Sequence, residues 1–221
     1  MVLGRLSQGE HSSTTLTINN MKIGPKYKLA RRLGAPIFEK TQTAKYQLSL
    51  ARKEKSGTGR GKTKSEFGKQ LAEKQKARFT YGLTERQFRI YVVKSRKSAE
   101  PVQKLFATIE SRLDNVLYRS GFTKTRAQAH QAAGHGHIMV NGRRVTVPSI
   151  LLRIGDKLSL RAGSTSSPLF AEVSERMKAQ AAPAWIKVEP DVREATVSGV
   201  PAYNPAEHQF DLGVVIEFYN R

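Results

Sequence analysis

The chain contains no cysteine among its 221 residues and is poor in acids, with 18 Asp and Glu against 38 Lys and Arg. Without cysteine it can form neither disulfides nor thiolate metal sites, which suits a reducing compartment. No apolar run approaches the ~20 residues of a membrane-spanning helix. The N-terminus also lacks the charged start and apolar core of a signal peptide. We therefore expect a soluble protein that is not secreted.

The shortage of acids leaves a net charge of +20 and an isoelectric point near 10.4, while 38% of the residues are hydrophobic. Such a chain can bury a core, but its folded form repels itself unless a polyanion neutralises it. Nucleic acid is the expected partner, and an anionic membrane surface is the weaker alternative.

The positive charge is concentrated in one part of the chain. Residues 1–20 carry only Arg5 and Glu10 as charges and predict either an extension upstream of Met21 or a natural tail. From Lys22 to Arg78 there are 17 basic and 4 acidic residues, a net of +13. Beyond residue 163 the sign reverses, with 5 basic and 8 acidic residues. We expect the basic region to contact RNA and the acidic end to face another protein.

Residues 56–64 read SGTGRGKTK, in which alternating glycines oppose a helix and predict an extended, solvated loop. A nucleotide-binding phosphate loop is the alternative, but the glycine spacing is wrong and no apolar strand precedes it. We expect Arg60, Lys62 and Lys64 to project from this loop toward RNA.

Two basic helices are predicted next, one beginning at Glu66 and ended by Gly82, the other continuing through Val92. The second should begin at the run Thr84-Glu85-Arg86-Gln87, which has the form of a capping box. The aromatic residues of these helices either stack on bases or hold a small helical domain together. We favour the second interpretation.

Apolar residues at spacings of three and four predict one continuous helix from Pro101 to Ser120. Arg112, Asn115 and Arg119 fall outside the apolar stripe, so we expect them on the solvent side. There they would meet successive phosphates or the base edges of one RNA strand.

A shorter helix should begin at Thr125, which opens another capping box, and end just before Gly134. Its first turn points unpaired backbone N–H groups outward, with Lys124 and Arg126 beside them. The start of this helix is therefore a predicted phosphate site.

Asn141-Gly142, between two alternating strands, predicts a tight β-hairpin with Arg143 and Arg144 at its tip. A further strand, Leu158–Leu160, should follow the turn at Gly155. His135 and His137 precede the hairpin and raise the alternative of a metal site. No Cys, Asp or Glu lies near them in sequence as a third ligand, so RNA contact or local structure is favoured.

The acidic end predicts a helix over residues 169–180 and strands over residues 184–188 and 214–219, which should pack back on the rest of the chain. No acid/base or nucleophile grouping is visible there or elsewhere.

Two stretches together resemble a known family. The run ESRLDNVLYRSGFTKTRAQAHQAAGHGHIMVNGRRV resembles the RNA-binding domain named after ribosomal protein S4. YGLTERQFR before it and VIEFYNR at the end resemble the small-subunit ribosomal S4 family itself, bacterial or organellar type without zinc cysteines. The resemblance spans residues 21–221.

The resemblance implies a structural protein without enzymatic activity, cofactor or metal, which binds the 5′ part of small-subunit rRNA and nucleates early assembly. It further implies a place near the path by which mRNA enters the subunit, an effect on translational accuracy and contact with a neighbouring ribosomal protein. The expected location is the small subunit of a cytoplasmic ribosome, or alternatively an organellar one. Two alternatives remain: an RNA-modifying enzyme with the same small domain, and a regulatory RNA-binder.

The RNA-facing positions that the resemblance implies in the small domain are Arg112, Asn115, Arg119, Thr125, Arg126, Gln128, His135, His137, Asn141, Arg143 and Arg144. In the N-terminal domain we expect rRNA contacts from Arg31, Arg32, Arg86 and Arg89, and mRNA contacts from Arg60, Lys62 and Lys64. Where many relatives carry arginine, this chain has His130 and Gly134, which predicts weaker or pH-dependent phosphate contact on that face.

The expected fold class is α+β, with a basic helical N-terminal domain and a small helix-helix-hairpin domain that carries an antiparallel sheet. The expected divisions are a tail at residues 1–20, a helical rRNA-binding domain at 21–107, an S4-type domain at 108–167 and a C-terminal segment at 168–221.

Overall fold

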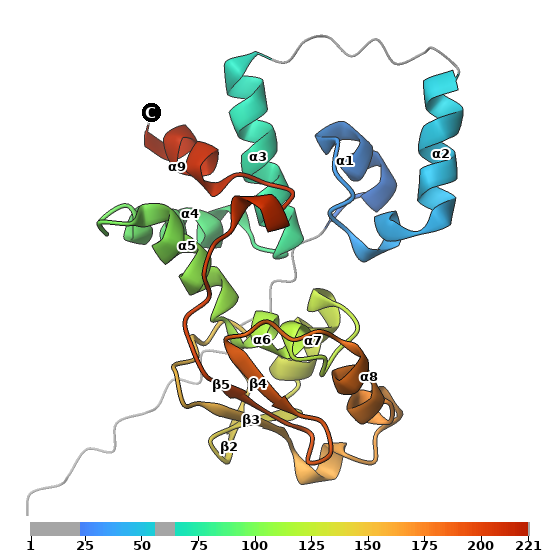
Figure 1. Cartoon of the computed structure of the whole chain (residues 1–221), viewed down its shortest axis with the longest axis vertical. Coiled ribbons are helices and arrows are strands. Elements are labelled where there is room, and N and C mark those ends of the chain that lie inside the picture. The colour runs from blue at the N-terminus through green and yellow to red at the C-terminus, as the bar shows by residue number, and fades with distance from the viewer. Residues whose placement is uncertain (1–22, 56–64, 221) are drawn as a thin grey trace, which may run out of the picture.

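The computed structural model describes residues 23–55 and 65–220, which form a helical body and a second body built on a β-sheet (Figure 1). The expected α+β class is confirmed. The predicted tail at residues 1–20 and the predicted loop at 56–64 lie outside the described residues.

The first described elements form a small unit of their own. Helix α1 (Lys26–Leu33), the 3₁₀ helix η1 (Glu39–Gln42) and helix α2 (Ala44–Lys55) follow one another. Ala30, Phe38 and Tyr46 are buried together as its core. Helix α1 ends because Gly34 adopts the left-handed conformation, with φ of 72°.

The main helical body consists of α3 (Glu66–Thr80), α4 (Glu85–Ser95), α5 (Pro101–Glu110) and α9 (Leu212–Asn220). The predicted start of α4 is confirmed, since the Thr84 hydroxyl accepts a hydrogen bond from the Gln87 backbone N–H (3.3 Å). Phe88 is fully buried among Leu105 and Ile109. The aromatic residue at the centre of α4 therefore supports the core and is not available to stack on bases.

The predicted C-terminal strand is wrong, because residues 214–219 belong to helix α9. The valines and isoleucine of this run suggest a strand, but Leu212, Val215 and Ile216 recur at helical spacing and are buried against α3 and α5. Asp211 accepts hydrogen bonds from the backbone N–H groups of Gly213 (2.7 Å) and Val214, which caps the helix. Tertiary packing thus overrides β-propensity here.

The second body packs helices α6 (Leu113–Arg119), α7 (Arg126–Gly134) and α8 (Val173–Ala179) on an antiparallel sheet. The strands are β1 (Ile138–Val140), β2 (Arg143–Val145), β3 (Lys157–Leu160), β4 (Ile186–Glu189) and β5 (Glu194–Val197), in the spatial order β2-β1-β3-β5-β4. The predicted hairpin is confirmed, with positive φ at both Asn141 (49°) and Gly142 (74°). The predicted C-terminal helix is shortened to α8, preceded by the 3₁₀ helices η2 (Ala162–Ser164) and η3 (Pro168–Phe170).

The predicted continuous helix over residues 101–120 is also wrong, since it breaks between α5 and α6. The loop at 148–152 takes over the backbone partners at the break. Leu113 N donates to Ile150 O (2.9 Å), and Leu152 N donates to Ser111 O (2.8 Å). The apolar spacing continues through the break because both helices bury that stripe, but in different cores.

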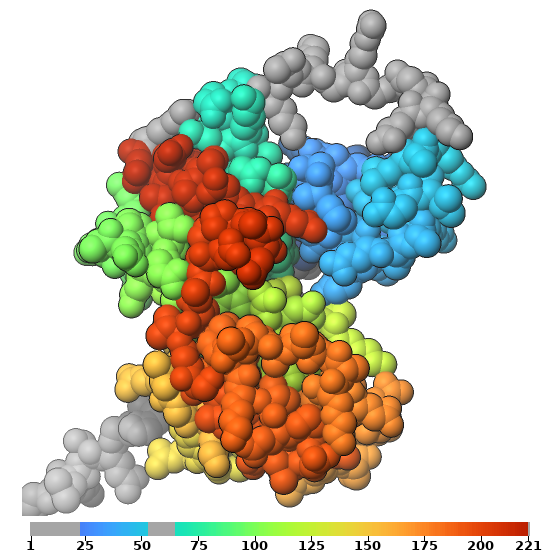
Figure 2. Space-filling view, in the orientation of Figure 1, coloured from blue at the N-terminus to red at the C-terminus, as the bar shows by residue number. Residues whose placement is uncertain are grey.

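The C-terminal segment links the two bodies. Strands β4 and β5 extend the sheet beyond β3, and the chain then passes the 3₁₀ helix η4 (Pro205–Glu207) and returns to the helical body as α9 (Figure 2). On the way, Gln103 of α5 donates to Pro201 O (2.7 Å) and accepts from Tyr203 N (2.8 Å).

Replacement of Gly121 by alanine is expected to destabilise the protein by about 2–4 kcal/mol. Gly121 has a φ of +83°, and a Cβ atom there would lie 3.0 Å from the Met177 Cα of α8. Gly155→Ala is the matched control, because Gly155 has a φ of +93° but open space around it. Urea unfolding should show the larger loss for Gly121→Ala, and equal losses would contradict a crowding cost.

Candidate nucleic-acid interface

The junction between the two bodies contains a buried carboxylate, that of Glu110 at the end of α5. Glu110 is only 1% exposed. From the helical body, the Tyr81 hydroxyl donates to Glu110 Oε1 (2.7 Å). From α6, Arg119 donates through Nε (3.1 Å) and Nη2 (2.8 Å), and the Asn115 amide donates to Oε2. One side chain therefore ties residues of both bodies together.

The charge of Glu110 is maintained by its neighbours. Burial by itself raises the pKa of this carboxyl, but the hydrogen bonds and charge of Arg119, with the charge of Arg126, outweigh it and hold the pKa below its usual range. Burial, together with the charge of Glu110, raises the pKa of the Tyr81 hydroxyl. The tyrosine thus stays a neutral donor to an ionised acceptor.

Arg126, at the start of α7, completes this network. Its Nε donates to Asn115 Oδ1 (2.9 Å), and its guanidinium lies over the rings of Tyr118 (4.3 Å) and Tyr81 (5.2 Å). Both stacking contacts and the hydrogen bond hold the cation inside the junction.

A second buried network lies beside the first. Arg112, 2% exposed, donates through Nε to Asp114 Oδ1 (3.0 Å) and through Nη1 to the Tyr91 hydroxyl (2.7 Å). His130 Nδ1 lies 3.1 Å from Asp114 Oδ2. Burial raises the pKa of the Asp114 carboxyl, but hydrogen bonds from His130 and Arg112 and the Arg112 charge bring it below the usual range.

The prediction that Arg112, Asn115 and Arg119 point to solvent is therefore wrong for Arg112 and Asn115, which are buried. The Arg119 side chain is 30% exposed, but its Nε and Nη2 donate to Glu110. Because of the break at residue 111, α6 runs in a different direction from α5. Positions on α6 that lie outside the predicted apolar stripe therefore face the junction between the bodies. Glu110 and Asp114 stand among these cations in the sequence. Their presence could have indicated that the cations form ion pairs inside the protein.

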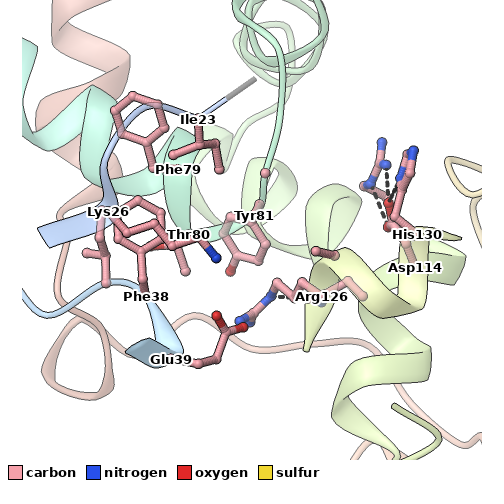
Figure 3. Close-up of a pocket in the computed structure, with 15 residues that line it drawn as sticks. Ile23, Lys26, Phe38, Glu39, Phe79, Thr80, Tyr81, Asp114, Arg126 and His130 are labelled. Atoms are coloured by element: carbon pink, nitrogen blue, oxygen red, sulfur yellow. Dashed lines mark hydrogen bonds and ion pairs between the residues drawn. The ribbon is translucent and has the colours of Figure 1, made fainter. Parts of the chain in front are cut away.

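Figure 3 shows the small pocket beside these networks, where α1, η1, the end of α3 and α7 meet. Arg126 and Glu39 point toward one another in it, and Asp114 and His130 form its far wall. Because the Asp114 and Arg126 side chains already have partners inside the protein, the pocket belongs to the junction.

The start of α7 has the predicted cap but little free charge. Thr125 Oγ1 accepts from Gln128 N (3.1 Å), and Gln128 Oε1 accepts from Lys124 N (2.8 Å). The Lys124 ammonium pairs with Glu172 on the surface (3.0 Å). At the other end of α7, the left-handed residue is Gly136, with φ of 71°, and Gly134 is the last residue of the helix.

The predicted residues that remain at the surface gather around the β-hairpin. Arg143, Arg144 and His135 are exposed, and Arg144 Nη2 donates to the His135 carbonyl (3.2 Å). Arg161, which the sequence patterns did not single out, is also exposed. It lies beside them because its backbone N–H donates to His137 O (2.9 Å). The pairing register of β1 with β3 could have predicted that Arg161 lies next to His137. We call His135, Arg143, Arg144 and Arg161 the hairpin surface.

His137 and Asn141 have local structural partners. His137 Nδ1 lies 2.9 Å from Ser164 Oγ, and Asn141 bonds to Asp156 Oδ1 (2.8 Å) and Lys157 N (2.9 Å) across the turns. Burial and then the nearby charges of His135, Arg161 and Arg144 lower the pKa of His137. Over residues 23–55 and 65–220, no cluster of three or more His, Cys, Asp and Glu side chains is placed to hold a metal ion.

The helical body contributes a second basic surface, with Arg86 and Arg89 exposed on α4. Arg32 on α1 is exposed too, whereas Arg31 is half-buried and donates to Tyr27 O (3.2 Å). The predicted mRNA-facing residues Arg60, Lys62 and Lys64 lie outside the described residues. None of the helices in the described part of the chain combines the length and the apolar character needed to cross a membrane.

Known proteins match both bodies. Residues 21–111 match the family model of the ribosomal protein S4/S9 N-terminal domain, and residues 111–158 match that of the S4 domain. The small ribosomal subunit protein uS4 of Chloroflexus aurantiacus is 38% identical over 202 residues, 90% of this chain and 98% of that protein. The chain belongs to the uS4 family.

The uS4 proteins of Roseiflexus castenholzii and Heliobacterium modesticaldum are 39% and 35% identical, again over 90% of this chain and 98% of their own length. Because this family is structural, the alternative of an RNA-modifying enzyme is set aside. The two matched regions meet at residue 111, where α5 ends and the Glu110 network joins the bodies.

Glu110→Ala is expected to lower the free energy of unfolding by about 2–4 kcal/mol, because it removes the carboxylate that accepts from Tyr81, Asn115 and the partly buried Arg119. Urea unfolding of the full chain measures this. Glu172→Ala, which removes an exposed carboxylate from a surface ion pair, is the control and should be close to wild type. A loss below about 1 kcal/mol for Glu110→Ala would show that the network is not a stabilising one.

Stability should also depend on pH through Glu110. Its pKa is lower in the folded than in the unfolded state, so its contribution is present above the ordinary carboxyl range of about pH 4.3 and is lost as the pH falls through the folded value. The stability gap between wild type and Glu110→Gln should therefore narrow with falling pH. Urea midpoints measured between about pH 7 and pH 3 test this, and a gap independent of pH would contradict it.

Proposed function

We propose that this protein is a structural constituent of the small ribosomal subunit and binds small-subunit rRNA directly. The observation that carries the proposal is the hairpin surface, where Arg143 and Arg144 are exposed on β2, one of the two edge strands of the sheet. Membership of the uS4 family and the net charge of +20 support it. Phosphate neutralisation by such side chains would supply most of the affinity.

The hydrogen-bonded junction between the bodies supports recognition of RNA shape. The hairpin surface belongs to one body and the exposed arginines of α4 to the other, and the Glu110 network joins the two. An RNA that contacts both surfaces must match their fixed separation. Such matching selects a folded rRNA junction over an unstructured strand.

Finer roles follow from the same proposal. Binding to the 5′ part of the rRNA would nucleate early assembly of the subunit body. The predicted loop with Arg60, Lys62 and Lys64 would lie near the path by which mRNA enters, and through it the protein would affect accuracy. The acidic C-terminal segment, with Glu207 and Asp211 exposed, would face a neighbouring ribosomal protein.

Arg143→Ala/Arg144→Ala is expected to weaken binding to a transcribed 5′ fragment of small-subunit rRNA by roughly 10-fold or more, and to reduce the salt slope by about 1 per lost phosphate contact. Because the Arg144 guanidinium packs against Gly136, Arg143→Ala is measured in parallel. Lys178→Ala/Lys187→Ala removes the same charge from exposed positions on the acidic segment and should bind normally. Equal binding by all of these variants would refute the proposal.

A further inference from the structure

Helix α4 has two unlike faces. Phe88, Val92 and Ser95 are buried on its inner face. The opposite face carries the exposed residues Arg86, Arg89, Ile90 and Val93, which recur at helical spacings of three and four. We call these four residues the outer face of α4.

The cations of the outer face are not neutralised within the described part of the chain. Glu85, the one acid of α4, turns away to accept from Lys74 (2.9 Å) and from the Tyr219 hydroxyl (2.7 Å). The side chains of Arg86 and Arg89 make no hydrogen bond or ion pair with residues 23–55 or 65–220. An anionic partner is therefore the occupant that fits this face.

The adjacent helix α3 shows the contrast. It carries lysines as well, but its own acids pair with them at a spacing of three, as Lys69 with Glu66 (3.4 Å) and Lys76 with Glu73 (2.7 Å). If the arginines of α4 served only to keep the protein soluble, acids on α4 could pair with them in the same way. On α4 the positions beside the arginines are apolar instead.

Those apolar positions indicate which anionic partner fits. Ile90 is 45% and Val93 is 44% exposed, and neither can bond to a phosphate or read the edge of a base. The minor groove of an RNA duplex is wide and shallow and presents ribose between two rows of phosphates. A helix face with β-branched residues between arginines matches that surface, because the apolar groups meet ribose carbons while the cations meet phosphates.

We propose that the outer face of α4 docks in the minor groove of a double-helical rRNA segment. Arg86 and Arg89 contact phosphates of that segment, and Ile90 and Val93 pack on its riboses. This inference rests on the proposed rRNA-binding function and adds the class of RNA structure and the residues that recognise it.

Two double variants separate the polar and apolar contributions. Ile90→Ser/Val93→Ser should weaken binding to the 5′ rRNA fragment roughly 10-fold without changing the salt slope, because no phosphate contact is lost. Arg86→Gln/Arg89→Gln should weaken binding and reduce the slope by about 2. The matched control is Val192→Ser/Val200→Ser, which changes two apolar residues of the acidic C-terminal segment that are 62% and 60% exposed and should bind as wild type. Thermal melting should be unchanged in all three, since every altered side chain is at the surface.

Hydroxyl-radical footprinting, which reports the exposure of riboses, identifies the RNA surface. With Ile90→Ser/Val93→Ser, protection should be lost over a run of paired nucleotides on both strands and retained elsewhere. Loss confined to unpaired nucleotides would overturn the inference. So would normal RNA binding by this variant combined with poor incorporation into small subunits, since that result assigns the face to a protein partner.

The hairpin variant distinguishes this inference from the function on which it rests. If Arg143→Ala/Arg144→Ala weakens binding and both α4 variants bind as wild type, rRNA binding stands and the α4 inference fails. If the hairpin and α4 variants all bind as wild type, the proposed function fails as well.

Discussion

The interaction on which the rest of the structure depends is the set of hydrogen bonds to the buried carboxylate of Glu110. Burying a charge is costly, and here the cost is offset because Tyr81, Asn115 and Arg119 all donate to it. These donors come from both bodies. Loss of the carboxylate would therefore destabilise the contact between the bodies as well as the side chains themselves.

The network divides the cations of a very basic chain into two groups. Arg112, Arg119 and Arg126 bond to acceptors inside the protein or lie over aromatic rings, so they help to position the two bodies. Other cations are exposed, and two groups of them form the hairpin surface and the outer face of α4. The Glu110 network joins the two bodies that carry these surfaces, and in the proposed function their separation selects an RNA of matching shape.

The C-terminal segment reinforces the same arrangement. It adds β4 and β5 to the sheet of one body and α9 to the core of the other, with Gln103 holding the chain between them. Its acidic residues lie on the segment that joins the bodies. A surface of this sign is repelled by phosphate, so it is unsuited to RNA contact.

The α+β class, the hairpin at Asn141-Gly142, the caps at Thr84 and Thr125 and the family could all be predicted from residue order, because each depends on local sequence. The break in the helix after Pro101, the helix over residues 212–220, the burial of Arg112 and Asn115 and the pairing of Arg119 with Glu110 came to light only in the folded chain. These outcomes depend on partners distant in the chain. The loop at 148–152 replaces helical hydrogen bonds at the break, and the packing of α9 on α3 outweighs strand propensity. Burial next to Glu110 and Asp114 decides whether an arginine pairs inside the protein or faces RNA.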